Sequence, residues 1–382
     1  MPDPVIYLDH AATTPMRPGV WEAMAPFAAQ TFGNASGGHG AARRAKEALE
    51  DARERVAAAI GARPLEVVFT AGGTEADNLA VKGAVLAGGE RRGVVTTAIE
   101  HAAVLDSARF VATLGCPLAV VGVDRAGVAD PAEVADAVSA ETGLVSVMAA
   151  NNEVGARQPV RKIADEAKAA GAVLVHTDAV QAVVSEPLDV EDLGVDLMSI
   201  AAHKFGGPKG VGALYVRRGV RLEPVMHGGG HELGRRSGTQ NVMGAVGMAV
   251  AMEVAVTDRD RFRRDVAEAR DRFEAGLSGA TPEIVVNAAQ ERLVQHSHIR
   301  FPGVPNDLLL IALDRAGVAA SAASACQSGA ATTSHVLSAM GMSDAQAGEC
   351  LRFSFGWSSI LAEADEAAGR VASAVASLDL TS

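Results

Sequence analysis

Between residues 65 and 216, short aliphatic and β-branched runs alternate with longer segments that have helical periodicity. Some runs, such as residues 144–148 and 173–175, are almost continuously apolar, which is typical of strands covered on both faces. The alternation predicts an α/β fold in which crossover helices connect a mostly parallel sheet. We expect seven strands, which begin near Val67, Val94, Leu118, Leu144, Val173, Leu197 and Gly212.

The pattern on either side of this region predicts further helices and a second core. Residues 41–60 are expected to form a charged amphipathic helix, and residues 242–256 a buried helix that runs on into charged positions. A chain of 382 residues is long for a single core. We predict a large domain over residues 13–255 and a smaller α+β domain over residues 256–382, on which residues 1–12 pack. The smaller domain is expected to contain strands near Ile284, His298 and Leu351 and a helix over residues 362–378.

Composition narrows the class of protein. Hydrophobic residues make up 48% of the chain and charged residues 21%, as in an ordinary globular protein. A net charge of −12 and a pI near 5.3 argue against direct nucleic-acid binding. The N-terminus has no secretory pattern and the longest apolar stretch is too short to span a bilayer, so we expect a cytoplasmic protein without membrane contact. Three cysteines without CxxC spacing, Cys116, Cys326 and Cys350, argue against a disulfide framework and a zinc site.

Lys204 is the first candidate catalytic residue. It follows an apolar run, residues 197–202, and enters a glycine-rich turn that ends at Gly210. Taken alone, a surface lysine in a turn is the commoner interpretation of such a position. A primary amine held this way also suits a Schiff base with an aldehyde, and pyridoxal phosphate is the commonest aldehyde bound by proteins.

The residues that follow the other strands strengthen the chemical interpretation, because ligands of open α/β sheets bind beyond the carboxyl ends of the strands. The first strand leads to Gly73 and Thr74 at the start of a helix, where free N–H groups can hold a phosphate. Later strands lead to three further polar positions, His101, Asn152 and Asp178. Each of them has a structural alternative as a helix cap, a turn residue or a satisfied core histidine.

Taken together, the strand-end residues match what pyridoxal phosphate requires. Asp178 would keep the pyridine nitrogen protonated, His101 would lie over the ring, and Asn152 with Gln181 would bond O3′. Thr74 and Gly73 would bind the phosphate. The nearest rival is a dinucleotide site, but residues 71–74 do not supply the GxGxxG pattern that such a site needs.

With these residues the chain resembles a known family, the NifS/IscS-type cysteine desulfurases of the class V aminotransferase group. The resemblance implies a fold-type I pyridoxal-phosphate enzyme and extends over almost the whole chain, from residue 7 to residue 356. Its markers are Gly33 and Asn34; Gly73, Thr74 and Glu75; Glu100 and His101; residues 151–155; Asp178 and Gln181; His203 and Lys204; residues 207–210, 228–232 and 236–239; Cys326; and Arg352.

The resemblance implies roles for the candidate cofactor residues. Lys204 would carry pyridoxal 5′-phosphate, and His101 would stack on the ring and move protons. His203 would join Thr74 at the phosphate. Thr239 would reach the phosphate of the other subunit's cofactor, which implies a homodimer with shared active sites.

The substrate side is also implied by the resemblance. Arg352, helped by Asn152, would hold the carboxylate of L-cysteine, since a guanidinium matches a carboxylate bidentately. Cys326 would take the sulfur as a persulfide, leaving L-alanine, and pass it to an acceptor protein. The family usually has serine at the position of Ala201, so one phosphate contact is missing or replaced.

Several alternatives stay open. The acceptor is expected in iron-sulfur assembly, tRNA thiolation or DNA phosphorothioation. The amino-acid sequence around Cys326 is similar to that of desulfurases in the last of these pathways. Selenocysteine lyase or another class V activity is the alternative enzyme, although transamination has no use for a second thiol. A non-catalytic scaffold that docks partners is the alternative outside enzymes, and intact Lys204, Asp178 and His101 count against it.

Overall fold

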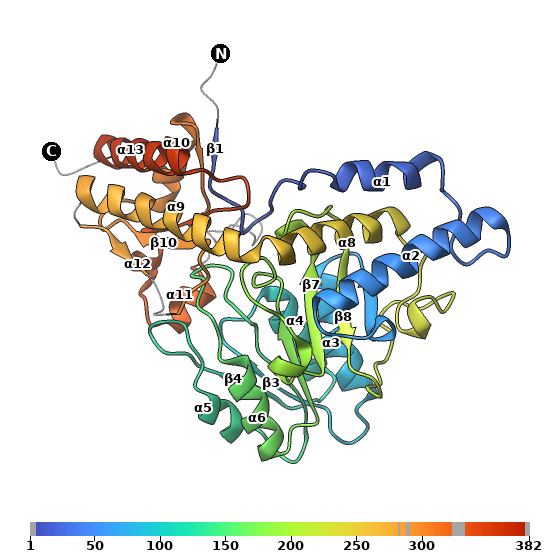
Figure 1. Cartoon of the computed structure of the whole chain (residues 1–382). Helices are drawn as coiled ribbons and strands as arrows, with labels where there is room; N and C mark the ends of the chain where they lie inside the picture. The colour runs from blue at the N-terminus through green and yellow to red at the C-terminus, as the bar shows by residue number, and fades with distance from the viewer. Residues whose placement is uncertain (1–4, 282, 288–290, 323–332, 379–382) are drawn as a thin grey trace.

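The structure is a computed structural model that describes residues 5–281, 283–287, 291–322 and 333–378 (Figure 1). All seven predicted strands are present in one sheet, with the order β2-β8-β7-β6-β5-β3-β4. β8 runs antiparallel to both of its neighbours and the other pairs are parallel, so the predicted α/β fold is confirmed. The strands are β2 (Val67–Thr70), β3 (Gly93–Thr97), β4 (Leu118–Val121), β5 (Thr142–Ser146), β6 (Leu174–Asp178), β7 (Leu197–Ala201) and β8 (Gly212–Val216).

Helices cover both faces of this sheet, which explains the consecutive apolar residues in strands such as β2 and β8. On β7, Leu197 packs in the cluster under α3 and α4, whereas Met198 and Ile200 pack in the cluster under α2 and α8. The predicted helices over residues 41–60 and 242–256 are found as α2 and α8. The helices of this region are α1 (Val20–Ala29), α2 (Gly40–Ala59), α3 (Gly73–Ala87), α4 (Ala102–Thr113), α5 (Pro131–Asp136), α6 (Val160–Ala170), α7 (Val190–Leu193) and α8 (Val242–Thr257), with 3-10 turns η1 (Pro64–Glu66), η2 (Ala202–Lys204) and η3 (Glu232–Gly234).

The rest of the chain builds a smaller α+β region, which Figure 1 shows in orange and red at the upper left. Its antiparallel sheet has the order β12-β10-β9, and α13 packs along α9. We keep the division into residues 13–255 and 256–382 as a proposal; α8 and α9 meet at Asp258. The elements are α9 (Arg259–Ala280), β9 (Val285–Val286), β10 (His296–Arg300), α10 (Asn306–Arg315), β11 (Val318–Ala319), α11 (His335–Ala339), α12 (Asp344–Ala347), β12 (Cys350–Ser354) and α13 (Leu361–Ser377). None of the helices described is both long and apolar enough to cross a membrane.

The N-terminal segment connects the two regions. β1 (Ile6–Tyr7) pairs in parallel with β11, and the carbonyl of Leu8 accepts a hydrogen bond from the N–H of Ser354 on β12. A few residues later, the N–H of Thr14 donates to the carbonyl of His203, just beyond β7. The segment therefore passes between the carboxyl end of the large sheet and the smaller region.

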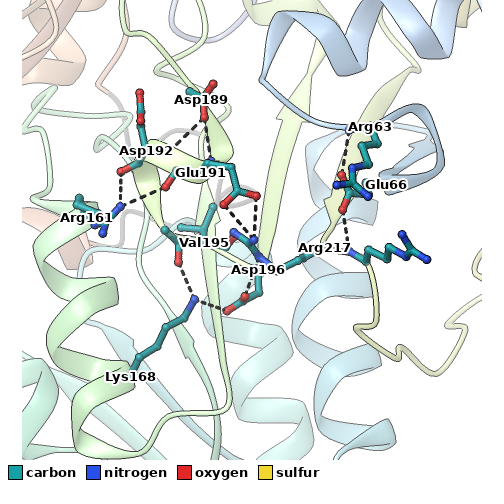
Figure 2. Close-up of polar contacts among 12 residues, drawn as sticks. Arg63, Glu66, Arg161, Lys168, Asp189, Glu191, Asp192, Val195, Asp196 and Arg217 are labelled. Atoms are coloured by element: carbon teal, nitrogen blue, oxygen red, sulfur yellow. Dashed lines mark hydrogen bonds and ion pairs between the residues drawn. The ribbon is translucent and has the colours of Figure 1, made fainter.

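Charged side chains form ion pairs at the opposite, amino-terminal edge of the central strands (Figure 2). Asp196, just before β7, lies 3.0 Å from Lys168 and 3.1 Å from Arg217, and it also accepts from the N–H of Val175. Arg217 bonds Glu191 of α7 as well. These ion pairs tie α6 and α7 to the edge of the sheet opposite the carboxyl ends of the parallel strands.

Candidate active site

A cavity of about 300 Å³ lies at the carboxyl ends of the central strands, within the size range of small-molecule sites. Its wall combines strand-end residues of the large sheet with residues of the N-terminal segment and the smaller region. The structure brings together in it nine of the residues singled out from the sequence: Gly73, Thr74, His101, Asn152, Asp178, Gln181, His203, Lys204 and Arg352.

Lys204 lies in the 3-10 turn η2 immediately after β7, so the strand end delivers its amine to the cavity. Its Nζ donates to the carbonyl oxygens of Ala11 (2.5 Å) and Ala12 (2.9 Å). The Nε2 of Gln181 donates to the same Ala11 carbonyl at 3.0 Å. The N-terminal segment thus orients both side chains from one side of the cavity.

Asp178 ends β6 and is buried at the wall of the cavity. One carboxylate oxygen accepts from the N–H of Val180 at 2.9 Å, which fixes the direction of the side chain. Burial raises the pKa of Asp178, while His101, the Val180 N–H and Lys204 act in the opposite direction. A carboxyl group in these surroundings is well suited to a ligand that presents a protonated ring nitrogen.

His101 is the residue that caps α4, and its Nδ1 accepts from the N–H of Ala103 at 3.1 Å. This contact leaves the proton of the neutral ring on Nε2. Burial lowers the pKa of His101, and the positive charge of Lys204 lowers it further, although Asp178 acts to raise it. A neutral imidazole held in this way presents its Nε2–H as a hydrogen-bond donor on the side away from the Ala103 N–H.

The phosphate-binding expectation concerns the first turn of α3. Gly72 precedes it with φ 155°, a conformation that L side chains rarely adopt, and a Cβ on Gly73 would lie 2.9 Å from a methyl group of Val180. Thr74 follows in the same turn. Gly73 and Thr74 line the cavity at the start of the helix, where free backbone N–H groups can hold an anion.

A second hollow, of about 760 Å³, adjoins the first turn of α3 on the outer side. Thr13, Thr74, His203 and Lys209 all line it. The Nδ1 of His203 lies 3.2 Å from the hydroxyl of Thr13, and burial lowers the pKa of His203 to about 4. Thr13 was given no role from the sequence, whereas Lys209 belongs to the marker residues 207–210 and offers a cation in this hollow.

Arg352, at the centre of β12, brings the smaller region to the cavity. Its Nη1 donates to the carbonyl of Asn152 at 2.7 Å, and its Nη2 forms an ion pair with Asp9 at 2.7 Å. The guanidinium is almost completely buried. Arg352 lines the same cavity as Lys204, which suits a small substrate that carries both an amino group and a carboxylate.

Thr239 is not among the residues that line the cavity, and it is exposed on the segment after η3. Cys326 lies outside the described residues. The described residues on either side of it reach the site: Ser321 pairs with the backbone of Arg352, and the Nε2 of His335 donates to the carbonyl of Glu100 at 2.9 Å in the cavity wall.

His298 gives the smaller region an acid-sensitive group. It is buried opposite Arg352 on the paired strands, and its Nδ1 contacts Asn287 at 3.1 Å. Burial, followed by the charge of Arg352, lowers the pKa of His298 from 6.5 to about 3. Below pH 6.5 the unfolded chain therefore binds a proton that the folded chain does not, and the folded state loses about 1.4 kcal/mol per pH unit.

We expect the substitution His298→Gln, which removes the titrating group, to reduce this loss. Between pH 6.5 and pH 5 the stability of the variant relative to the wild type should improve by roughly 2 kcal/mol. Urea denaturation at the two pH values measures the difference. A difference that stays constant with pH would mean that His298 is protonated in the folded chain.

Comparisons with known proteins agree with this geometry. Residues 6–366 match the family described as aminotransferase class-V. The chain is 45% identical over 379 residues to an IscS-like cysteine desulfurase of Mycobacterium tuberculosis, covering 97% of this chain and 96% of that protein. It is 42% identical over 353 residues to the cysteine desulfurase IscS of Dictyoglomus turgidum, covering 92% and 89%. A solved structure described as a NifS-like protein superposes with a TM-score of 0.91 and 36% identity, over 98% of this chain and 100% of that one.

The fold and the matches define the protein class first: the chain belongs to the class V aminotransferase family. Within that family it belongs to the NifS/IscS-type cysteine desulfurases. The resemblance read from the sequence is therefore confirmed, and the desulfurase prediction is confirmed over the alternative class V activities.

Proposed function

We propose that the cavity binds pyridoxal 5′-phosphate and L-cysteine, and that the chain converts L-cysteine to L-alanine while Cys326 accepts the sulfur. The observation that carries the proposal is one cavity that joins an amine, a buried carboxyl group, an imidazole and a guanidinium: Lys204, Asp178, His101 and Arg352. Asp178 and Arg352 lie in strands, His101 caps α4 and Lys204 lies in the turn η2, so regular elements hold all four groups.

The residues of the cavity fit the cofactor that the family implies. Lys204 would hold its aldehyde carbon, Asp178 its ring nitrogen, and Asn152 and Gln181 its O3′. The backbone of Gly73 with Thr74 and His203 would bind the phosphate, which leaves Ala201 without a contributing hydroxyl. When bound, pyridoxal phosphate supplies an aldehyde and a ring that withdraws electrons from the substrate Cα.

The side chains of the protein account for the remaining steps. Arg352 orients the substrate by its carboxylate, and Lys204 and His101 hold and move protons beside Cα. The thiolate of Cys326 then attacks the substrate sulfur, so that a new S–S bond forms as the C–S bond breaks. The electron pair of the broken bond stays with the substrate carbon, where a proton completes L-alanine, and Cys326 keeps the sulfur as a persulfide.

We further propose a homodimer with shared active sites. Thr239 is exposed and is not among the residues that line the cavity of its own chain, as expected of a residue that serves a neighbouring subunit. Three residues earlier, Arg236 bonds Glu75 at 2.7 Å and 3.2 Å, which ties this segment to the first turn of α3. The sulfur acceptor, in iron-sulfur assembly, tRNA thiolation or DNA phosphorothioation, remains a prediction.

Product analysis tests the proposed reaction. The purified holoenzyme, given L-cysteine and a thiol reductant, should release L-alanine and sulfide in equal amounts, because each C–S cleavage yields one of each. Amino-acid chromatography and a colorimetric sulfide assay measure the two products. Formation of a keto acid in place of L-alanine would indicate transamination, turnover of selenocysteine alone would indicate a lyase, and absence of both products would favour a docking scaffold.

A further inference from the structure

The guanidinium of Arg352 is held by two fixed contacts before any substrate arrives. Its Nη1 donates to the carbonyl of Asn152, and its Nη2 donates to the carboxylate of Asp9, both at 2.7 Å. The side chain of Arg352 is 5% exposed and that of Asp9 is 22% exposed, so the ion pair is largely shielded from water. Burial of a guanidinium is costly unless it is paired, and Asp9 supplies the opposite charge.

Asp9 is itself rigidly placed, because backbone hydrogen bonds hold the chain on both sides of it. The carbonyl of Leu8 accepts from Ser354, and the N–H of Ala11 donates to the Ser354 hydroxyl at 2.8 Å. The carbonyl of Asp9 accepts from the hydroxyl of Tyr7 at 3.1 Å. Asp9 contacts the guanidinium but is not among the residues that line the cavity.

Other charged groups near Arg352 do not take over this role. Within the described residues, Asp9 is the one carboxylate that forms an ion pair with Arg352. Glu153 accepts a hydrogen bond from Ser334 at 2.6 Å instead. Burial lowers the pKa values of His296 and His298 to about 3, so both rings are neutral near pH 7.

We propose that Asp9 is a positioning residue for substrate binding: it holds the Arg352 guanidinium in the orientation that receives the carboxylate of L-cysteine. The inference rests on the function proposed above. A guanidinium has five N–H donors, and the contacts with Asn152 and Asp9 use two of them. A bidentate carboxylate needs two of the remaining three, so Asp9 and the substrate can share Arg352 at the same time.

Kinetics of Asp9 variants of the holoenzyme test this role. Asp9→Ala removes the acceptor, and we expect the KM for L-cysteine to rise about tenfold with little change in kcat, since one charge-assisted hydrogen bond that orients the substrate clamp is lost. Asp9→Asn keeps an oxygen that can accept from Nη2, and its KM should stay close to that of the wild type. Binding of 2-aminoethanethiol, which lacks the carboxylate, should be the same in all three proteins. Asp165→Ala, which breaks an exposed ion pair with Arg161, is the matched control.

The possible outcomes separate the inference from the proposed function. A lower KM in both Asp9 variants would mean that the charge of Asp9 competes with the substrate, which overturns the positioning role. If Arg352→Ala raises KM and Asp9→Ala leaves it unchanged, the role of Asp9 is wrong while the substrate clamp stands. If Arg352→Ala itself has the wild-type KM, the carboxylate assignment in the proposed function fails. Visible absorbance of the cofactor in each variant confirms that the protein is folded and loaded.

Discussion

Replacement of Lys204 by alanine is expected to remove covalent cofactor attachment and to lower L-cysteine turnover by roughly 10³-fold or more. The loss should be large because one amine both holds the cofactor aldehyde and moves protons beside the substrate. Borohydride treatment followed by peptide mass spectrometry should find the cofactor mass on the Lys204 peptide of the wild type and on no peptide of the variant. A steady-state sulfide assay measures the loss of turnover.

Lys168→Ala is a suitable control for this experiment. Lys168 contacts Asp196 and the carbonyl of Gly194 at the opposite edge of the sheet, so its loss removes a lysine without touching the cavity (Figure 2). Turnover and labelling should then match the wild type. If Lys204→Ala keeps full turnover, or if borohydride fixes the cofactor to another lysine of the wild type, the assignment of Lys204 is wrong.

The sequence predicted the large sheet well because its strands are buried on both faces. Burial by α3 and α4 on one side and by α2 and α8 on the other requires apolar residues at consecutive positions, and such runs stand out from the helices between them. The antiparallel direction of β8 was not predicted, since no local pattern reports the direction of a strand. Backbone topology decides it.

The cavity residues could be predicted to the extent that they follow strands. Asp178 is the last residue of β6, and His101 and Lys204 lie in the short segments that follow β3 and β7. The carboxyl ends of parallel strands meet at one edge. The contacts of the Ala11 and Ala12 carbonyl groups with Lys204 could not be predicted in this way, because every residue type has a backbone carbonyl.

Ion pairs between residues far apart in the chain could not be predicted from the sequence either. Arg53 lies among the charged residues of α2, yet it is buried and bonds Glu232 at 2.6 Å. Glu232 and Leu233 adopt positive φ values of 50° and 58°, which the buried ion pair helps to hold. Periodicity predicts which face of a helix is buried, but it does not identify a partner 179 residues away.

The substitution Cys326→Ser is expected to leave the visible absorbance of the cofactor unchanged and to lower sulfide and persulfide production by roughly 10²-fold or more. A hydroxyl is a far weaker nucleophile than a thiolate, so the substrate sulfur has no acceptor when serine replaces cysteine. Spectral changes on addition of L-cysteine should persist, because Lys204, Asp178 and Arg352 are intact. Persulfide labelling of the isolated protein should find the sulfur on Cys326 of the wild type only.

The other two cysteines provide internal controls for the thiol. Cys350 lies buried on β12, where burial raises its pKa to about 11 and its Sγ donates to the carbonyl of Gln346, so it stays a protonated thiol near neutral pH. Cys116 is buried as well, beside the helices that cover the large sheet. Cys116→Ser and Cys350→Ser should therefore keep wild-type sulfide production in the folded protein. Full turnover by Cys326→Ser with a thiol reductant would instead show that free thiol attacks the substrate sulfur directly, and Cys326 would have no part in the reaction.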